Sequence, residues 1–166
     1  MIVFTGVACS RWQSSGLLFF ALMMFRDVLS AFFLVNRNPS PCAGSRSVTL
    51  LAYVSSGLPL IYLGPTGSAS VSVLMAASVL SIVGYAVSTF ALIELGHSFG
   101  VAPANRGRIT TGVYRIADHP MYLGYLLAES GLVFANSANV SIFVFSSVLY
   151  LFRARAERRV VFITGL

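Results

Sequence analysis

The 166-residue chain has little charge, only two cysteines and no lysine. Charged residues make up 10% of it and hydrophobic residues 57%, a more apolar composition than soluble domains usually have. The mean hydropathy of +0.83 agrees with this. The shortage of charge excludes an ordinary soluble domain and predicts an integral membrane protein.

The basic residues are 11 arginines, set against five acidic residues. Such an excess could indicate a nucleic-acid partner, but most of the arginines flank apolar runs and do not form a soluble basic face. The positive-inside rule accounts for them better. We therefore expect the lipid bilayer, and no nucleic acid, as a partner.

The cysteines, Cys9 and Cys42, lie in different segments, and neither belongs to a closely spaced pair of the kind that binds zinc. We therefore expect neither a disulfide framework nor a metal site. The sequence also contains no internal repeat. One membrane domain spanning residues 1–166 is the prediction.

Apolar runs of membrane-spanning length divide the chain into five predicted helices. The loops between them carry, in order, two, no, three and no arginines, and the tail carries four. This alternation predicts an external amino terminus and a cytoplasmic carboxyl terminus, with the third loop and the tail on the same side. The predicted fold is an all-α, polytopic membrane helical bundle, with helices at approximately 16–35, 47–63, 69–95, 119–135 and 140–160.

Two charged residues, Arg26 and Asp27, lie near the middle of the first predicted helix. Each would cost about 2.5–3.5 kcal/mol in lipid, so both should face protein or water. Adjacent helical residues point about 100° apart and need not pair with each other. These residues could line a substrate cavity or join helices. Arg26 and Glu129 are our candidates for contact with a substrate, and Asp27 and Glu94 are further polar candidates for its cavity.

Residues 111–125, TGVYRIADHPMYLGY, crowd charged, imidazole, aromatic and glycine residues beside a predicted membrane helix. Pro120 suits the first turn of that helix, with Asp118 or His119 as the N-cap. The free N–H groups and the dipole at this helix end favour an anion, such as a carboxylate. Any chemistry should therefore lie at this helix end.

A stripe of polar and aromatic residues leads inward from this end. His119 and Tyr122 are three residues apart and share a helix face, and Glu129 follows Tyr122 by seven residues on that face. Gly124 could admit either a ligand or a neighbouring helix to the backbone. In the basic tail, Arg153 and Glu157 are four residues apart and could form an ordinary ion pair.

Residues 96–125, GHSFGVAPANRGRITTGVYRIADHPMYLGY, followed by RARAERRV, resemble the isoprenylcysteine carboxyl methyltransferase and phospholipid methyltransferase family of integral membrane enzymes. The family pattern runs approximately G-x-S-F, then G-x-Y-R, then R-H-P-x-Y-x-G, and ends in paired glutamates after the last helix. The ordered combination is more specific than H-P-x-Y alone. The resemblance covers roughly residues 95–160, and the earlier helices match only as hydrophobic spans.

The resemblance implies S-adenosylmethionine as the cofactor, bound within residues 96–160 at the cytoplasmic ends of the last two helices. It also implies a membrane-embedded, lipid-like or prenylated methyl acceptor of the isoprenylcysteine carboxylate type. By position in the pattern, the implied cofactor-binding residues are Tyr114, Arg115, His119, Pro120, Tyr122, Leu123, Gly124 and Glu157.

The chemistry of these residues agrees with that role. The cofactor has an ammonium, a carboxylate and a sulfonium, which call for an acid, a cation or helix N-terminus, and an aromatic face. Glu157, Arg115 with the start of the helix, and Tyr114 or Tyr122 offer these groups. Methylation of an already ionised carboxylate needs alignment and exclusion of water but no general base. We therefore assign no catalytic acid or base.

Two positions differ from the family pattern: Asp118 stands where an arginine usually precedes His-Pro, and Arg158 stands where the second glutamate is expected. Two alternatives to the methyltransferase therefore stay open. One is a non-catalytic homologue that keeps the fold for helix association. The other is a sterol-type membrane reductase that uses NADPH, because such enzymes can show a similar H-P-x-Y segment.

Overall fold

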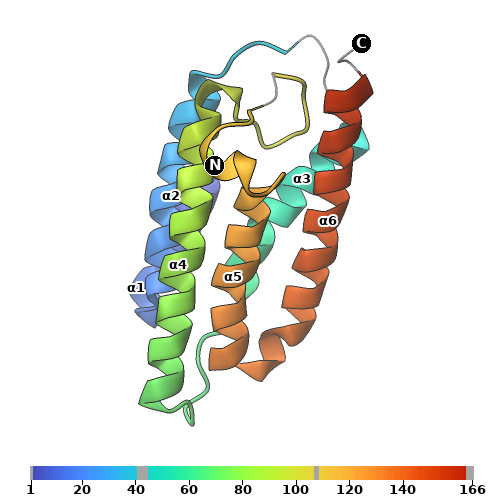
Figure 1. Ribbon diagram of the computed structural model, residues 1–166. Coiled ribbons are helices and arrows are strands. Elements are labelled where there is room, and N and C mark those ends of the chain that lie inside the picture. The colour runs from blue at the N-terminus through green and yellow to red at the C-terminus, as the bar shows by residue number, and fades with distance from the viewer. Residues whose placement is uncertain (1, 41–44, 107–108, 164–166) are drawn as a thin grey trace.

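The computed structural model (Figure 1) describes residues 2–40, 45–106 and 109–163, and only the backbone of the last three of these. Cys42 and Arg108 lie outside the described residues. The described part is all-helical, as predicted, and has no strand. Its α-helices are α1 (Ile2–Ser15), α2 (Leu18–Val35), α3 (Arg46–Gly57), α4 (Val71–Leu95), α5 (Pro120–Ala135) and α6 (Val140–Ile163).

The five predicted helices correspond to α2 through α6. The second of them ends as an α-helix at Gly57 and continues as the short 3₁₀ helix η1, Leu58–Ile61. Pro59, the second residue of η1, has no N–H to donate to the helical ladder, which fits the change at this point. The predicted helix boundaries thus lie within a few residues of the observed ones, except that the 47–63 helix is divided.

The α1 helix was not predicted from the sequence. It contains Thr5, Gly6 and Arg11 among its apolar residues and ends in polar ones, so it has no apolar run of membrane-spanning length. In the structure α1 packs against α2, and Gly16 forms the turn between them with a φ of 64°, a conformation that glycine adopts without strain. The part of the chain that the structure describes therefore has one more α-helix than predicted.

Within the described residues, three helical segments are long and apolar enough to cross a membrane: Leu18–Val35, Val71–Ser98 and Ser137–Val160. The α3 and α5 helices have 12 and 16 residues, or about 18 and 24 Å of length, whereas the hydrocarbon core is about 30 Å thick. The structure thus supports a membrane protein but does not confirm five spans. The orientation across the membrane stays a prediction.

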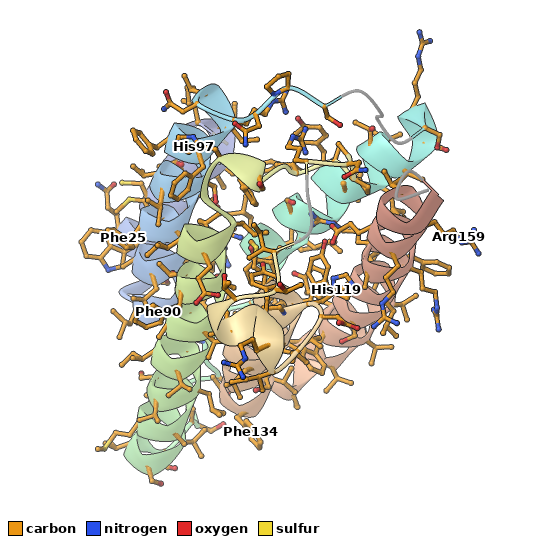
Figure 2. The ribbon with its side chains drawn as sticks, turned by 45° about the horizontal axis from the view of Figure 1, so that its top comes forward. Phe25, Phe90, His97, His119, Phe134 and Arg159 are labelled. Carbon is orange, nitrogen blue, oxygen red and sulfur yellow. The ribbon has the colours of Figure 1, made fainter. Side chains whose placement is uncertain are left out.

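The distribution of polarity matches a lipid environment. Large apolar side chains such as Phe25, Phe90 and Phe134 point outward and are more than 60% exposed (Figure 2). Polar side chains are buried between the helices, where other groups can satisfy them. These buried polar residues are Arg26, Asp27, Ser30, Ser55, Ser81, Ser88, Glu129, Asn139, Ser146 and Arg153.

Helices α4 and α5 touch through their backbones. A Cβ atom built on Gly124 would lie 2.6 Å from the carbonyl oxygen of Gly84 and 2.7 Å from the backbone nitrogen of Ser88. One built on Gly84 would lie 2.4 Å from the backbone nitrogen of Ala128. Small residues permit this close approach. Of the two possibilities left open for Gly124, the structure shows contact with a neighbouring helix.

We expect Gly124→Ala to destabilise the protein by about 1–3 kcal/mol, because the added methyl group meets rigid backbone and the helices must separate. Thermal and chemical unfolding of the purified protein in detergent measures this loss. Gly6→Ala in α1 is the matched control, since a Cβ there has nothing within 4 Å, and alanine is the better helix former. Equal destabilisation by both substitutions would contradict the close packing.

The segments that follow α2 and α4 lie at the same end of the bundle as the end of α6, at the top of Figure 1. The third predicted loop and the tail are therefore on the same side, as the arginine pattern indicated. The short 3₁₀ helices η2 (Gly96–Ser98) and η3 (Gly112–Arg115) belong to the long segment between α4 and α5. At the opposite end, η4 (Ser137–Asn139) joins α5 to α6.

Candidate functional site

A cavity of about 260 Å³ lies at the loop end of the bundle, lined by α2, α3, the end of α4, α5, α6 and the segment between α4 and α5. Five of the residues predicted from the sequence line it together: Arg26, Tyr114, His119, Tyr122 and Glu157. They come from α2, from η3, from the start of α5 and from α6. The cavity is thus a place where residues distant in sequence converge.

Glu157 of α6 is the point where α5 and α6 meet in the cavity. One of its carboxylate oxygens accepts a hydrogen bond from the hydroxyl of Tyr122, and the other lies 3.5 Å from Nδ1 of His119. His119 is the N-cap residue of α5, and Pro120 stands in the first turn. The three-residue spacing stacks the rings of His119 and Tyr122, with their centroids 5.8 Å apart. The Glu157 side chain still keeps 27% of its surface exposed, and it can contact a ligand.

Asp118 and Arg158, the two positions that differ from the family pattern, face each other at the rim of this cavity. A guanidinium nitrogen of Arg158 lies 3.0 Å from a carboxylate oxygen of Asp118. The Nε of Arg158 also donates to Nε2 of His119 over 3.3 Å. Both residues line the cavity. The two departures are therefore partners in one ion pair.

Three tyrosines, Tyr114, Tyr122 and Tyr125, line the cavity. The Tyr122 ring stacks on Tyr150 with their centroids 5.6 Å apart and their planes 11° apart. The Arg153 guanidinium lies 5.2 Å from the centroid of Tyr122. Tyr114 belongs to η3, where burial raises the pKa of its hydroxyl, so that this group stays a neutral hydrogen-bond donor. An aromatic lining of this kind suits a cation or a flat ring.

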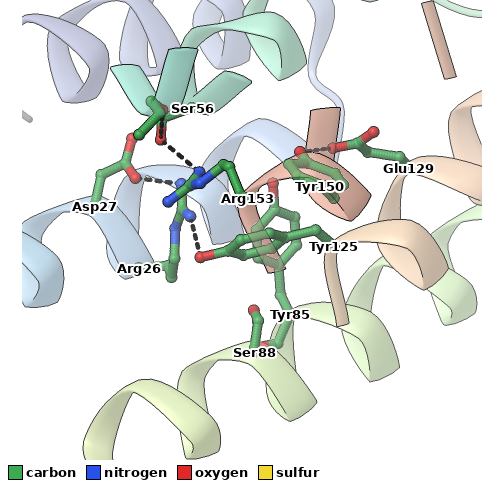
Figure 3. Close-up of polar contacts among 10 residues, drawn as sticks. Arg26, Asp27, Ser56, Tyr85, Ser88, Tyr125, Glu129, Tyr150 and Arg153 are labelled. Atoms are coloured by element: carbon green, nitrogen blue, oxygen red, sulfur yellow. Dashed lines mark hydrogen bonds and ion pairs between the residues drawn. The ribbon is translucent and has the colours of Figure 1, made fainter. Parts of the chain in front are cut away.

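Arg26 of α2 lines the cavity, and its polar contacts are drawn in Figure 3. It pairs with its neighbour Asp27 and donates to the hydroxyl of Tyr125 over 2.7 Å. Arg26 and Asp27 are 6% and 0% exposed. The adjacent residues do pair, although adjacency did not require it, and Arg26 both joins α2 to α5 and lines the cavity.

Arg153 lines the cavity, although the sequence suggested it only as an ion-pair partner of Glu157. The ion pair with Glu157 that its spacing allowed is not what holds it. Its guanidinium donates to Ser55 over 3.0 Å and to Ser56 over 3.2 Å in α3, and to the carbonyl of Val101 over 3.0 Å. Its place four residues before Glu157, on the same helix face, was the signal that could have identified it.

Other predicted residues lie outside the cavity lining. Glu129 is fully buried deeper in the bundle, where it accepts hydrogen bonds from the hydroxyls of Tyr62 over 2.8 Å and Tyr150 over 2.5 Å. Arg115 is exposed in η3, and Leu123 points outward and is 55% exposed. Pro120 and Gly124 are buried in α5. Any contact of these five residues with cofactor or substrate stays a prediction.

Glu94, another polar candidate, supports the loop that covers the cavity. Its carboxylate accepts a hydrogen bond of 2.8 Å from the backbone N–H of Val113. Gly112 has a φ of 52°, and a Cβ there would lie 1.5 Å from a carboxylate oxygen of Glu94. Only glycine fits this position. The glycine of the G-V-Y-R segment thus lets η3 dock on the end of α4 and places Tyr114 in the cavity.

A family model for phospholipid methyltransferases matches residues 65–161, more than half of the chain. The chain belongs to the phospholipid methyltransferase family. The match covers α4, α5, nearly all of α6 and the segment between α4 and α5, and so most of the cavity walls. No curated protein and no solved structure matches the chain significantly. Membership in this family, together with the apolar helices, points to a membrane methyltransferase.

Proposed function

We propose that the protein is an S-adenosylmethionine-dependent methyltransferase that acts on a membrane-embedded, lipid-like acceptor of the isoprenylcysteine carboxylate type. The observation that carries this proposal is the cavity at the loop end of the bundle. There Tyr122 and His119 of the H-P-x-Y segment meet Glu157 of α6, in the part of the chain that the family match covers.

The groups around the cavity fit the cofactor. The Glu157 carboxylate suits its ammonium group, because charge-assisted hydrogen bonds are among the strongest in proteins. The hydroxyl of Tyr114, which lines the cavity, can donate to its carboxylate. When bound there, S-adenosylmethionine would supply an activated methyl group. In our proposal these residues hold and orient the cofactor where the start of α5 meets the carboxyl-terminal part of α6.

The floor of the cavity fits an anionic acceptor. Arg26 and Arg153 both line it and are both 6% exposed. Asp27 offsets the charge of Arg26, whereas the hydrogen bonds of Arg153 go to two serine hydroxyls and a backbone carbonyl. An acceptor carboxylate would compensate this second buried charge. This supports Arg26 as a substrate residue and adds Arg153 beside it.

No proton transfer is required of the protein in this scheme. A carboxylate is ionised at neutral pH and is already nucleophilic, so the buried arginines would orient it in the part of the cavity that is shielded from water. The exposed apolar side chains of the bundle suit a lipid environment, so in our proposal a lipid-like acceptor reaches the cavity from the bilayer.

Transfer of a labelled methyl group from S-adenosylmethionine to a prenylated cysteine tests this proposal. We expect label in the free carboxylic acid but none in its preformed methyl ester, which presents no carboxylate to methylate. A total lipid extract widens the search for acceptors, and NADPH consumption with a sterol tests the reductase alternative. Absence of label from every acceptor would contradict the proposal and favour the non-catalytic homologue.

A further inference from the structure

The ion pair between Asp118 and Arg158, which we call the rim pair, contributes little to the stability of the fold. Both side chains are 56% exposed, and exposed ion pairs contribute only about 0–1 kcal/mol. The pair nevertheless lies on the cavity lining and joins the start of α5 to α6. Its placement is therefore better explained by the hydrogen bond that Arg158 donates to His119.

Arg158 fixes the hydrogen-bonding state of His119. A guanidinium has only donors, so an imidazole nitrogen that meets it must be the unprotonated acceptor. Here that nitrogen is Nε2, at 3.3 Å from the Nε of Arg158. The neutral ring then carries its proton on Nδ1, the nitrogen that lies 3.5 Å from Glu157. The imidazole thus presents a donor, and not a lone pair, to the carboxylate.

Glu157 is in this way held from both sides. Tyr122 donates to one carboxylate oxygen, and the His119 Nδ1–H faces the other. Asp118 in turn accepts a hydrogen bond from Arg158, which keeps the guanidinium beside Nε2 of His119. The side chains of the rim pair lie 40 residues apart in sequence, so this order exists only in the folded protein.

We propose that Asp118 and Arg158 are positioning residues for the cofactor site: they lock His119 in the tautomer with its proton on Nδ1, so that Glu157 is oriented toward the cationic ammonium of the ligand. This inference rests on the proposed function. In a chain without the rim pair, the imidazole could turn either nitrogen toward Glu157, and the carboxylate would no longer face a fixed Nδ1–H beside the Tyr122 hydroxyl. The two departures from the family pattern then act together in the site.

The tautomer can be measured without any ligand. The sequence has two histidines, so ¹⁵N-histidine labelling of the full chain in detergent gives two ring systems, which His97→Gln assigns. For His119 we expect an unprotonated Nε2, the acceptor from Arg158, and a protonated Nδ1. In Arg158→Ala we expect a mixture of tautomers. An unchanged single tautomer in Arg158→Ala would overturn the proposal.

Cofactor titration gives the second readout. We expect Arg158→Ala and Asp118→Asn each to weaken S-adenosylmethionine binding about tenfold, through loss of an oriented charge-assisted contact, and Arg158→Lys, which still donates, to stay within about threefold of wild type. Arg159→Ala, at an exposed position, is the control. Unchanged binding in Arg158→Ala would overturn the positioning role. If wild type binds no cofactor, the proposed function fails, whereas the tautomer measurement still decides whether the rim pair locks His119.

Discussion

Replacing Glu157 with alanine is expected to weaken S-adenosylmethionine binding about 30- to 100-fold, the equivalent of about 2–3 kcal/mol for a charge-assisted hydrogen bond. Glu157 is the carboxylate at the meeting point of α5 and α6, and both of its oxygens face groups of α5. Its removal takes away the negative charge for the ligand's ammonium and the acceptor of the Tyr122 hydroxyl. Calorimetric titration of the purified protein measures the change.

The matched control for this variant is Arg159→Ala, two residues further along α6. Arg159 is exposed and points away from the bundle in Figure 2. Its loss should change the affinity for S-adenosylmethionine by less than about twofold, since solvent and salt largely screen an exposed charge. If both variants bind the cofactor equally well, Glu157 is not part of the site.

Arg26→Met should have the largest effect on stability, a loss of about 3–5 kcal/mol, because it leaves a buried carboxylate without its partner. Asp27 is fully buried and its ion pair with Arg26 lies between the helices. The substitution also removes the hydrogen bond from α2 to Tyr125 in α5. Chemical unfolding in detergent, followed by helical circular dichroism, gives the free energy of unfolding.

The double variant Arg26→Met with Asp27→Leu separates the two roles of Arg26. With both charges gone, no ion is left unpaired, and most of the lost stability should return. The same variant should still bind the cofactor but transfer methyl groups poorly to a carboxylate acceptor. A double variant as unstable as the single one would contradict the ion-pair explanation, and unchanged methyl transfer would remove Arg26 from the acceptor site.

The amino-acid sequence predicts most of the helices of this fold for a simple physical reason. Lipid requires long apolar helices, and such runs are visible in the sequence for α2, α4 and α6. The α1 helix escapes prediction because it is mixed in composition, and its partner is α2. Whether α3 and α5 count as spans cannot be read from apolar character alone, since both are short.

The candidate site was predictable where its geometry is local. The three-residue spacing of His119 and Tyr122 places both rings on one helix face, and the structure stacks them. Contacts between elements depend on packing, which a helical pattern does not contain. The rim pair and the bonds of Arg153 to α3 are of this kind. Leu123 belongs to the same motif, but as the neighbour of Tyr122 it points about 100° away on the helix and faces outward.

Binding of S-adenosylmethionine to the wild-type protein is the most direct test of the cavity as a cofactor site. Titration of the purified full chain in lipid nanodiscs should show one saturable site per chain. S-adenosylhomocysteine should compete for that site, because it keeps the ammonium and carboxylate groups, and NADPH should not. Saturable binding with this competition is the result that we predict. An absence of saturable binding in wild type would contradict the account.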